Sequence, residues 1–427
     1  MIRIIKDRLD CREEIFSAVM EKVDVSKTVT EIIEKVRAEG DAALYFYAEK
    51  FDKAKLSSLR VSEEEINEAL SLVDSEFIEI LREAAENIRE FHRMQKNDGF
   101  TLKKGDGIVI GQKVIPVDVA GLYVPGGTAA YPSTVLMDAI PAKIAGVKRV
   151  VMVTPPNKEG KVNPVILAAA SVAGVDEIYK VGGAQAVAAL AYGTETIPKT
   201  DKIVGPGNAY VAEAKRQVYG LVSIDMIAGP SEIMIVADDK NRAKDIAADL
   251  LSQAEHDRMA SAVLVTDSED FAAKVSAELE RQIPILERAE IARESIDNYG
   301  KIIITASIDD AIDVANAIAP EHLELCLDDP FRYLKNVRHA GSVFLGRYCP
   351  EALGDYFAGT NHTLPTSGTA KFSSPLSVDD FVKKTQFIYY DKPALSEVSK
   401  KVEYFAKKEG LTAHAKSAVV RFEEDDE

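Results

Sequence analysis

Apolar residues recur at helical spacing through the first hundred residues of the chain. The segments DAALYFYAEKFD (41–52) and EFIEILREAAENIREFHRM (76–94) place apolar side chains three and four residues apart. This spacing is typical of amphipathic helices. Residues 1 to about 100 are therefore predicted to be helical.

From residue 107 the pattern changes to short β-branched runs that alternate with glycine-bounded helices. KRVVMVTPP (148–156) and DEIYKVGG (176–183) are predicted to be buried strands. Each follows a helix that ends in AGV, at 145–147 and 173–175, where the glycine suits a helix C-cap. This repetition predicts right-handed βαβ units with a parallel sheet, and it hints at an internal duplication.

A second α/β stretch runs from about 224 to 345. Its predicted strands are SEIMIVAD, ASAVLVTD, YGKIIITAS and GSVFLG. The segment 348–378 that follows is rich in glycine and proline and has little periodicity. A loop of that length in a compact protein is usually functional. The last fifty residues are predicted to be a mostly helical, separate tail.

Charge and cysteine usage exclude several classes of protein. A net charge of −17 argues against a nucleic-acid partner, which needs a basic surface. The uncharged stretch 120–137 is interrupted by glycine and proline, so no membrane helix is expected. The three cysteines, Cys11, Cys326 and Cys349, show no CxxC spacing, which indicates a reducing cytoplasm. Any metal site must therefore use histidine, carboxylate and amide ligands.

Two polar pairs are candidates for chemistry. Gln253 and His256 are three residues apart on a predicted helix, so both side chains leave one face. They form either a solvated polar face or half of a metal site. His322 follows Glu321, just after Pro320, which favours a helix start. A carboxylate beside an imidazole there suits a base beside a proton shuttle.

Further candidates lie near the C-terminus. Asp355 is in LGDY, His362 is in GTNHTLPT, and His414 follows Glu409 by five residues in EGLTAHA. The candidate metal ligands are Gln253, His256, Asp355 and His414. One amide oxygen, two imidazoles and one carboxylate suit zinc or a similar divalent ion. Ordinary surface or core side chains remain the simpler interpretation of the spacing alone.

Three glycine turns, YVPGGTAAYPS, YKVGGAQAVAALAYG and VGPGNAYVAEAKRQ, each separate a strand from a helix. Backbone N–H groups at such helix starts bind anions such as pyrophosphate. No GxGxxG is present, so plain βα turns explain them equally well. Ser231, in IDMIAGPSEIMIVADD, is predicted to lie at a strand end, where α/β enzymes place ligand contacts. An ordinary turn with a serine cap is the alternative.

Taken in order, these blocks resemble the histidinol dehydrogenase family. The similarity rests on IDMIAGPSE, LLSQAEH, VGGAQAVAALAYGT, VGPGN, APEHLEL, PEALGDYFAGTNHTLPT and EGLTAHA, and it runs from about residue 20 to 420. The resemblance implies the last steps of histidine biosynthesis. In these, L-histidinol is oxidised through L-histidinaldehyde to L-histidine while NAD is reduced twice.

The resemblance also implies roles for individual residues. Glu321 would activate water, and His322 would act as general base and acid. One zinc ion per subunit would be bound by Gln253, His256, Asp355 and, from the other subunit of a homodimer, His414. The implied substrate contacts are Ser231, Gln253, His256, His322, Asp355, Glu409 and His414. The implied NAD contacts are Tyr123, Gln185 and Asn208.

The expected fold is α/β, with two Rossmann-like parallel-sheet domains of an incomplete, duplicated type. An N-terminal helical segment (1–25) precedes the first domain (26–122 and 231–375), which would carry the substrate, zinc and catalytic residues. The second domain (123–230) would contact NAD. A C-terminal helical tail (376–427) would form the dimer and complete the site.

Three alternatives remain open from the sequence. A zinc hydrolase would use Glu321 and metal-bound water without NAD. A thiol route would use Cys326, four residues after His322 and on its face if the segment is helical, although the apolar setting ELCL indicates an inert thiol. A non-enzymatic nucleotide-binding protein would explain the glycine turns but not the Glu321–His322 pair or the metal-type ligands.

Overall fold

The computed structural model describes residues 2–6, 24–126 and 130–423. It divides into two compact units, residues 1–95 with 117–381 and residues 96–116 with 382–427. Most of the predicted N-terminal helical segment lies outside the described residues, as do Cys11 and the last acidic residues. The described start of that segment is a strand, β1 (Arg3–Lys6), rather than a helix. Among the described residues, no helix is long and apolar enough to cross a membrane.

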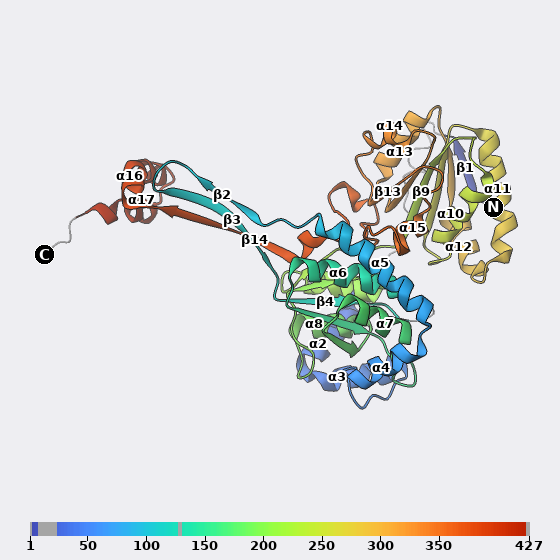
Figure 1. Cartoon of the computed structure of the whole chain (residues 1–427), viewed down its shortest axis with the longest axis horizontal. Helices are drawn as coiled ribbons and strands as arrows, with labels where there is room; N and C mark the ends of the chain where they lie inside the picture. The colour runs from blue at the N-terminus through green and yellow to red at the C-terminus, as the bar shows by residue number, and fades with distance from the viewer. Residues whose placement is uncertain (1, 7–23, 127–129, 424–427) are drawn as a thin grey trace. The chain divides into compact units, whose positions relative to one another are not determined.

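The first unit contains a five-stranded parallel sheet in the order β6-β5-β4-β7-β8. Its middle strand, β4, is labelled in Figure 1. Its strands are β4 (Val119–Tyr123), β5 (Arg149–Thr154), β6 (Glu177–Lys180), β7 (Lys202–Val204) and β8 (Ser223–Ile224). The crossover helices are α6 (Pro132–Ala145), α7 (Pro164–Ala173), α8 (Gly183–Tyr192) and α9 (Ala209–Val218). The helices α6 and α7 end at Gly146 and Gly174, whose φ angles of 91° and 78° favour glycine. The predicted βαβ repetition and both helix ends are confirmed.

Four N-terminal helices also cover this sheet. They are α2 (Ser26–Glu39), α3 (Asp41–Tyr47), α4 (Glu63–Leu72) and α5 (Ser75–Arg93). The apolar residues of α4 and α5 share a core with α6 and α7, and those of α2 and α3 share a core with α8 and α9. The structure thus packs these helices on the β4 sheet, whereas the sequence-based boundary grouped 26–122 with 231–375. An amphipathic pattern shows that a helix buries one face but does not show against which sheet.

A six-stranded parallel sheet follows in the same unit, in the order β1-β11-β10-β9-β12-β13. Its remaining strands are β9 (Glu232–Ala237), β10 (Ser261–Thr266), β11 (Lys301–Ile304), β12 (His322–Cys326) and β13 (Ser342–Leu345). Helices α10 (Ala243–Ala254), α11 (Glu269–Gln282), α12 (Ala289–Tyr299), α13 (Ile308–Ile318) and α14 (Pro330–Leu334) connect them. The α/β class with two parallel sheets is confirmed.

The strand β12 corrects one expectation, because a helix was predicted to start at Pro320. The helix α13 stops at Ala319, whose φ of 57° is left-handed. The following residues then pair with β9 on one side and β13 on the other, and every residue of β12 is buried. Alternating apolar residues at Leu323 and Leu325 favour a strand. The prediction of a helix gave too much weight to Pro320.

The second unit is a three-stranded antiparallel sheet with two helices. Its strands are β2 (Gly99–Lys103), β3 (Ile108–Pro116) and β14 (Val382–Tyr390), in the order β14-β3-β2. The helices α16 (Lys392–Lys408) and α17 (Thr412–Val419) follow β14. The C-terminal tail was predicted to be mostly helical, and the strand β14 was not predicted. Most side chains of β14 are exposed, so its sequence has no alternation of apolar and polar residues.

Candidate active site

Glu321 and His322 lie where β12 begins, beside the start of β9. The Glu321 Oε2 atom accepts a hydrogen bond of 2.8 Å from the backbone N–H of Glu232. The His322 Nδ1 atom lies 3.0 Å from the backbone oxygen of the same residue. One residue of β9 therefore orients both side chains. The other ring nitrogen of His322, Nε2, points toward Glu351 and Asp355.

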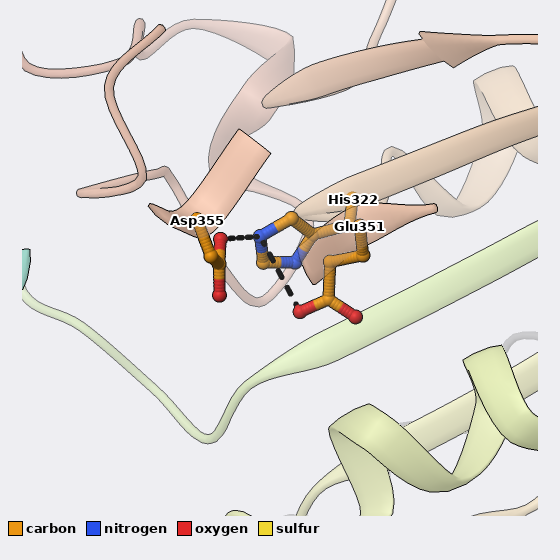
Figure 2. Close-up of side chains that lie close together, drawn as sticks. All are labelled: His322, Glu351 and Asp355. Carbon is orange, nitrogen blue, oxygen red and sulfur yellow. Dashed lines mark ion pairs between the residues drawn. The ribbon is translucent and has the colours of Figure 1, made fainter. Parts of the chain in front are cut away.

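A short helix, α15 (Glu351–Tyr356), supplies two carboxylates one turn apart. The Nε2 atom of His322 lies 3.7 Å from Asp355 Oδ1 and 3.9 Å from Glu351 Oε1 (Figure 2). Both separations are longer than a hydrogen bond. The ligand atoms of these three residues lie within 4.8 Å of one another, close enough to hold a metal ion.

The end of α10 meets the same carboxylates. Gln253 is buried, and with its amide oriented to satisfy its neighbours the nitrogen donates to both oxygens of Glu351, at 2.5 and 3.0 Å. His256 lies in the turn just after α10, not on the helix as predicted, and its backbone N–H donates to the backbone oxygen of Gln253 at 3.1 Å. Burial lowers the pKa of His256, and nearby Asp355 opposes that shift. Both predicted residues thus reach the cluster.

Burial and charge shift the pKa values of the central pair. Burial raises the pKa of Glu321 to about 8. Burial alone would lower the pKa of His322, but carboxylates, first among them Glu321 and Glu351, outweigh it and raise the pKa to about 10. A pocket with this excess of carboxylates favours a bound cation, whose charge would offset theirs.

Unpartnered polar atoms show that the pocket suits a metal. Among the described residues, His322 Nε2, His362 Nε2 and Asp355 Oδ1 are buried without a hydrogen-bond partner. Such atoms are costly unless a ligand completes them. Imidazole nitrogen and carboxylate oxygen are donors that zinc accepts, so the cluster around Asp355 and His256 fits a zinc ion.

A second group of polar side chains lies at the carboxyl edge of the five-stranded sheet. Tyr123 ends β4, and its hydroxyl accepts a 3.0 Å hydrogen bond from the N–H of Gly183. Gln185 is buried in the first turn of α8. Asn208 caps α9 through its Oδ1 atom. The strand order reverses between β4 and β7, which is where open α/β sheets bind dinucleotides.

The turn after β7 fits tightly against the end of β4. Gly205 has a φ of 114°, and a Cβ atom there would lie 2.1 Å from the backbone oxygen of Tyr123. Only glycine allows this approach. The helix starts that follow, α8 and α9, present backbone N–H groups suited to a pyrophosphate. The predicted NAD residues and these turns therefore fit a dinucleotide.

Asp52 lies close enough to Tyr123 to affect its pKa. Burial raises the pKa of Asp52 from 3.8 to about 6. The folded protein therefore disfavours the ionised form of Asp52. This lowers the free energy of unfolding progressively as the pH rises from about 4, near the pKa in the unfolded chain, to about 6, the pKa in the folded protein. We expect Asp52→Asn to raise the free energy of unfolding by roughly 1–2 kcal/mol at pH about 7.5, and by little at pH about 4. Urea unfolding at both pH values measures this difference.

The matched control is Asp239→Asn, at an exposed aspartate. This substitution should not raise the free energy of unfolding comparably at pH about 7.5. An Asp52→Asn gain that is equal at both pH values would contradict the assignment of the effect to a buried charge.

The remaining predicted contacts divide between the two units. Ser231 immediately precedes β9, in the first unit, and its backbone oxygen accepts from Ser261 at 2.9 Å. Glu409 ends α16 and His414 is on α17, both in the second unit, and both residues are exposed. Within the first unit, the structure therefore gathers Gln253, His256, Glu321, His322 and Asp355. The placement of His414 and Glu409 at a zinc site stays a prediction.

Comparison with known proteins gives the family. A family model described as histidinol dehydrogenase matches residues 17–422. Histidinol dehydrogenase of Clostridium acetobutylicum is 55% identical over 427 residues, which cover 99% of each chain. The chain belongs to the histidinol dehydrogenase family. The Bacillus cereus histidinol dehydrogenase is 58% identical over 402 residues, 94% of each chain. A crystal structure of the histidinol dehydrogenase from Elizabethkingia anophelis matches with a TM-score of 0.94 at 40% identity, covering 98% of each chain.

These matches confirm the resemblance that the motifs indicated, and they make the chain an oxidoreductase of the histidinol dehydrogenase type. Sequence reasoning left two residues of the pocket without a role. Glu351 contacts both Gln253 and His322, and its spacing of four from Asp355 on a helix was the available signal. His362 had been noticed, but its interaction with Asp355 is visible only in the structure.

Proposed function

We propose that this histidinol dehydrogenase family member oxidises L-histidinol through L-histidinaldehyde to L-histidine, with two molecules of NAD reduced in turn. The observation that carries the proposal is the Glu321–His322 pair. Both side chains are oriented by Glu232, and the Nε2 atom of His322 points into the carboxylate pocket beside Gln253. A fixed acid–base pair next to metal-type donors is what oxidation of an amino alcohol requires.

We propose that Gln253, His256 and Asp355, with His414 of the partner subunit, hold one zinc ion per subunit. The tighter group formed by His322, Glu351 and Asp355 shares only Asp355 with this set. We favour the set without His322, because a ligated Nε2 would be lost for proton transfer. Glu351 instead supports Gln253 through the amide contact. When bound, zinc would hold the amine and imidazole nitrogens of histidinol near the nicotinamide, and NAD would accept the hydride.

The chain's own residues would move the protons. A bound zinc ion would offset the carboxylate charge that raises the pKa of His322 to about 10, so that a neutral ring could take the alcohol proton at Nε2. The contact of Nδ1 with Glu232 fixes the ring. Glu321 would take a proton from the water that adds to the aldehyde. With a pKa of about 8, the carboxylate form that a general base needs would be populated increasingly as the pH rises through 8.

The other contacts follow the same proposal. Tyr123, Gln185 and Asn208 would hold NAD at the carboxyl edge of the β4 sheet. Ser231 and Glu409 would join the zinc ligands and His322 around the substrate, with Glu409 supplied by the tail. The protein would act as a homodimer. It would work in the cytoplasm, a location that fits the lack of CxxC spacing among its three cysteines.

The structure weakens the thiol alternative. Cys326 lies four residues along β12 from His322, about 13 Å away at strand spacing. Burial, reinforced by the charge of Glu324, raises the pKa of its thiol, so the nucleophilic thiolate is disfavoured. Membership of an oxidoreductase family likewise argues against a zinc hydrolase and a non-enzymatic nucleotide-binding protein.

Removal of the metal should abolish activity reversibly. The proposed ligands in the first unit belong to elements with their own apolar cores, so the fold should survive chelation. We expect a chelator to stop NAD reduction with little change in circular dichroism, and added zinc to restore the rate. Unfolding upon chelation would identify a structural metal instead.

A direct assay tests the proposed function. Purified protein should increase absorbance at the reduced-nicotinamide wavelength only when both NAD and L-histidinol are present. Histidinol consumption without NAD, or no reaction with histidinol after zinc loading, would refute the proposal.

A further inference from the structure

A buried ion pair holds the turn after β7. Lys215 on α9 and Asp225, just after β8, are only 2% and 1% exposed and are paired with each other. The Lys215 Nζ atom donates to the Gly205 oxygen at 3.0 Å. The Asp225 Oδ2 atom accepts from the Gly205 N–H at 2.8 Å. Both backbone polar groups of Gly205 are therefore fixed by this pair.

Asp138 of α6 lies on the other side of Gly205. Its side chain is fully buried, and its Oδ2 atom is 3.0 Å from where a Cβ atom of Gly205 would be. Its Oδ1 atom accepts a hydrogen bond of 3.0 Å from the hydroxyl of Thr363. Asp138 thus packs beside the Gly205 turn, where its Oδ2 atom has no hydrogen-bond partner, and its Oδ1 atom is bonded to a segment that comes more than a hundred residues later in the chain.

Each side of Asp138 leads to a different part of the proposed site. The Gly205 turn lies against Tyr123 and leads to Asn208, on the NAD side. Thr363 directly follows His362, which interacts with Asp355 on the substrate side. The hydrogen bond that Asp138 accepts comes from Thr363, which is neither a proposed catalytic residue nor a proposed metal ligand.

The environment of Asp138 favours its neutral form. Burial, and then the charge of Asp225, raise the pKa of Asp138 well above its usual value. An asparagine amide has nearly the same shape as a neutral carboxyl group and likewise offers a carbonyl oxygen that can accept from the Thr363 hydroxyl. The link to Thr363 therefore does not need a charge.

We propose that Asp138 is a positioning residue, which holds the NAD-side turn at Gly205 and the substrate-side segment at Thr363 in register for hydride transfer. This inference rests on the proposed NAD-linked oxidation. Hydride transfer needs its two carbon atoms about 3–3.5 Å apart, and a misplacement of about 1 Å can cost about 100-fold in rate. A link between the two sides should consequently affect kcat more than the binding of either ligand.

The test removes the hydrogen bond between Thr363 and Asp138 and keeps the shape of the side chain at residue 363. We expect Thr363→Val to lower kcat for histidinol oxidation by about 10- to 100-fold. The Kd for NADH, from its fluorescence, and the KM for histidinol should change less than about threefold. The deuterium isotope effect on kcat, with histidinol labelled at the carbinol carbon, should rise because hydride transfer becomes slower. Asp138→Ala should behave like Thr363→Val, and Asp138→Asn should keep most activity.

The matched control is Thr200→Val. The Thr200 hydroxyl is as buried and donates to the Leu190 oxygen at 3.0 Å, but it is not part of the link. Thr200→Val should lower the Tm about as much as Thr363→Val does, but it should leave kcat and the isotope effect unchanged. If Asp138→Ala does not fold, Thr363→Val carries the test alone.

Two results would overturn the inference. One is a Thr363→Val enzyme with the kcat and isotope effect of wild type and only the lower Tm of the control. The other is a loss confined to NADH affinity. If wild type and Thr200→Val themselves fail to reduce NAD with histidinol, the proposed function fails and the inference fails with it.

Discussion

Replacement of His322 by asparagine should reduce kcat by about 10²- to 10⁴-fold in both half-reactions, because each needs a proton transferred at this residue. Asparagine keeps a polar group toward the Glu232 backbone oxygen, where Nδ1 now lies at 3.0 Å, but has no titratable nitrogen. The measurement compares single-turnover rates of NADH formation from histidinol and from histidinaldehyde. Metal content should match wild type, because His322 is not a proposed ligand.

Glu321→Gln is the partner experiment. It removes the base for water and keeps an oxygen acceptor for the Glu232 N–H, now bonded at 2.8 Å. Oxidation of the aldehyde should fall much more than oxidation of the alcohol. Equal losses in the two half-reactions would contradict the division of labour between Glu321 and His322.

Mixed dimers should recover activity that neither parent has. His414→Ala removes the ligand in the second unit, and His256→Ala removes one in the first. If each zinc site takes His414 from the partner, one site of a mixed dimer carries both defects and the other carries none. With free exchange in an equal mixture, activity should return to about a quarter of the wild-type rate.

The control is each parent taken through the same exchange alone, which should stay nearly inactive. Mass spectrometry must show that mixed dimers form. Mixed dimers without recovered activity would place His414 in the site of its own chain and refute the shared arrangement.

The regular βαβ segments were predictable because their signals are local. The strand 149–154 contains the apolar run VVMV, and the strand 177–180 is a short β-favouring segment, EIYK. The helices before them are capped by Gly146 and Gly174, with the left-handed φ that glycine favours. The strand β14 has mostly exposed side chains, so its pairing with β3 left no comparable signal. Assignment of α2–α5 to a sheet depends on packing between distant segments, which periodicity does not report.

The candidate site shows the same limit. Motifs brought Gln253, His256, His322 and Asp355 to notice, and within the first unit the structure gathers all four. Glu351 lies in the motif PEALGDYFAGTNHTLPT but was given no role, and its role appears only because α15 brings it to Gln253 and His322. No sequence pattern singled out Asp138. Its link to Thr363 joins residues far apart in sequence.

The number of NADH molecules formed per histidinol tests the central claim most directly. Limiting L-histidinol is incubated to completion with excess NAD and zinc-loaded protein, and NADH absorbance is read alongside chromatographic analysis of the product. The account predicts about two NADH for each histidinol, with L-histidine as the product. One NADH with accumulated aldehyde, or loss of histidinol with no NADH, would contradict it.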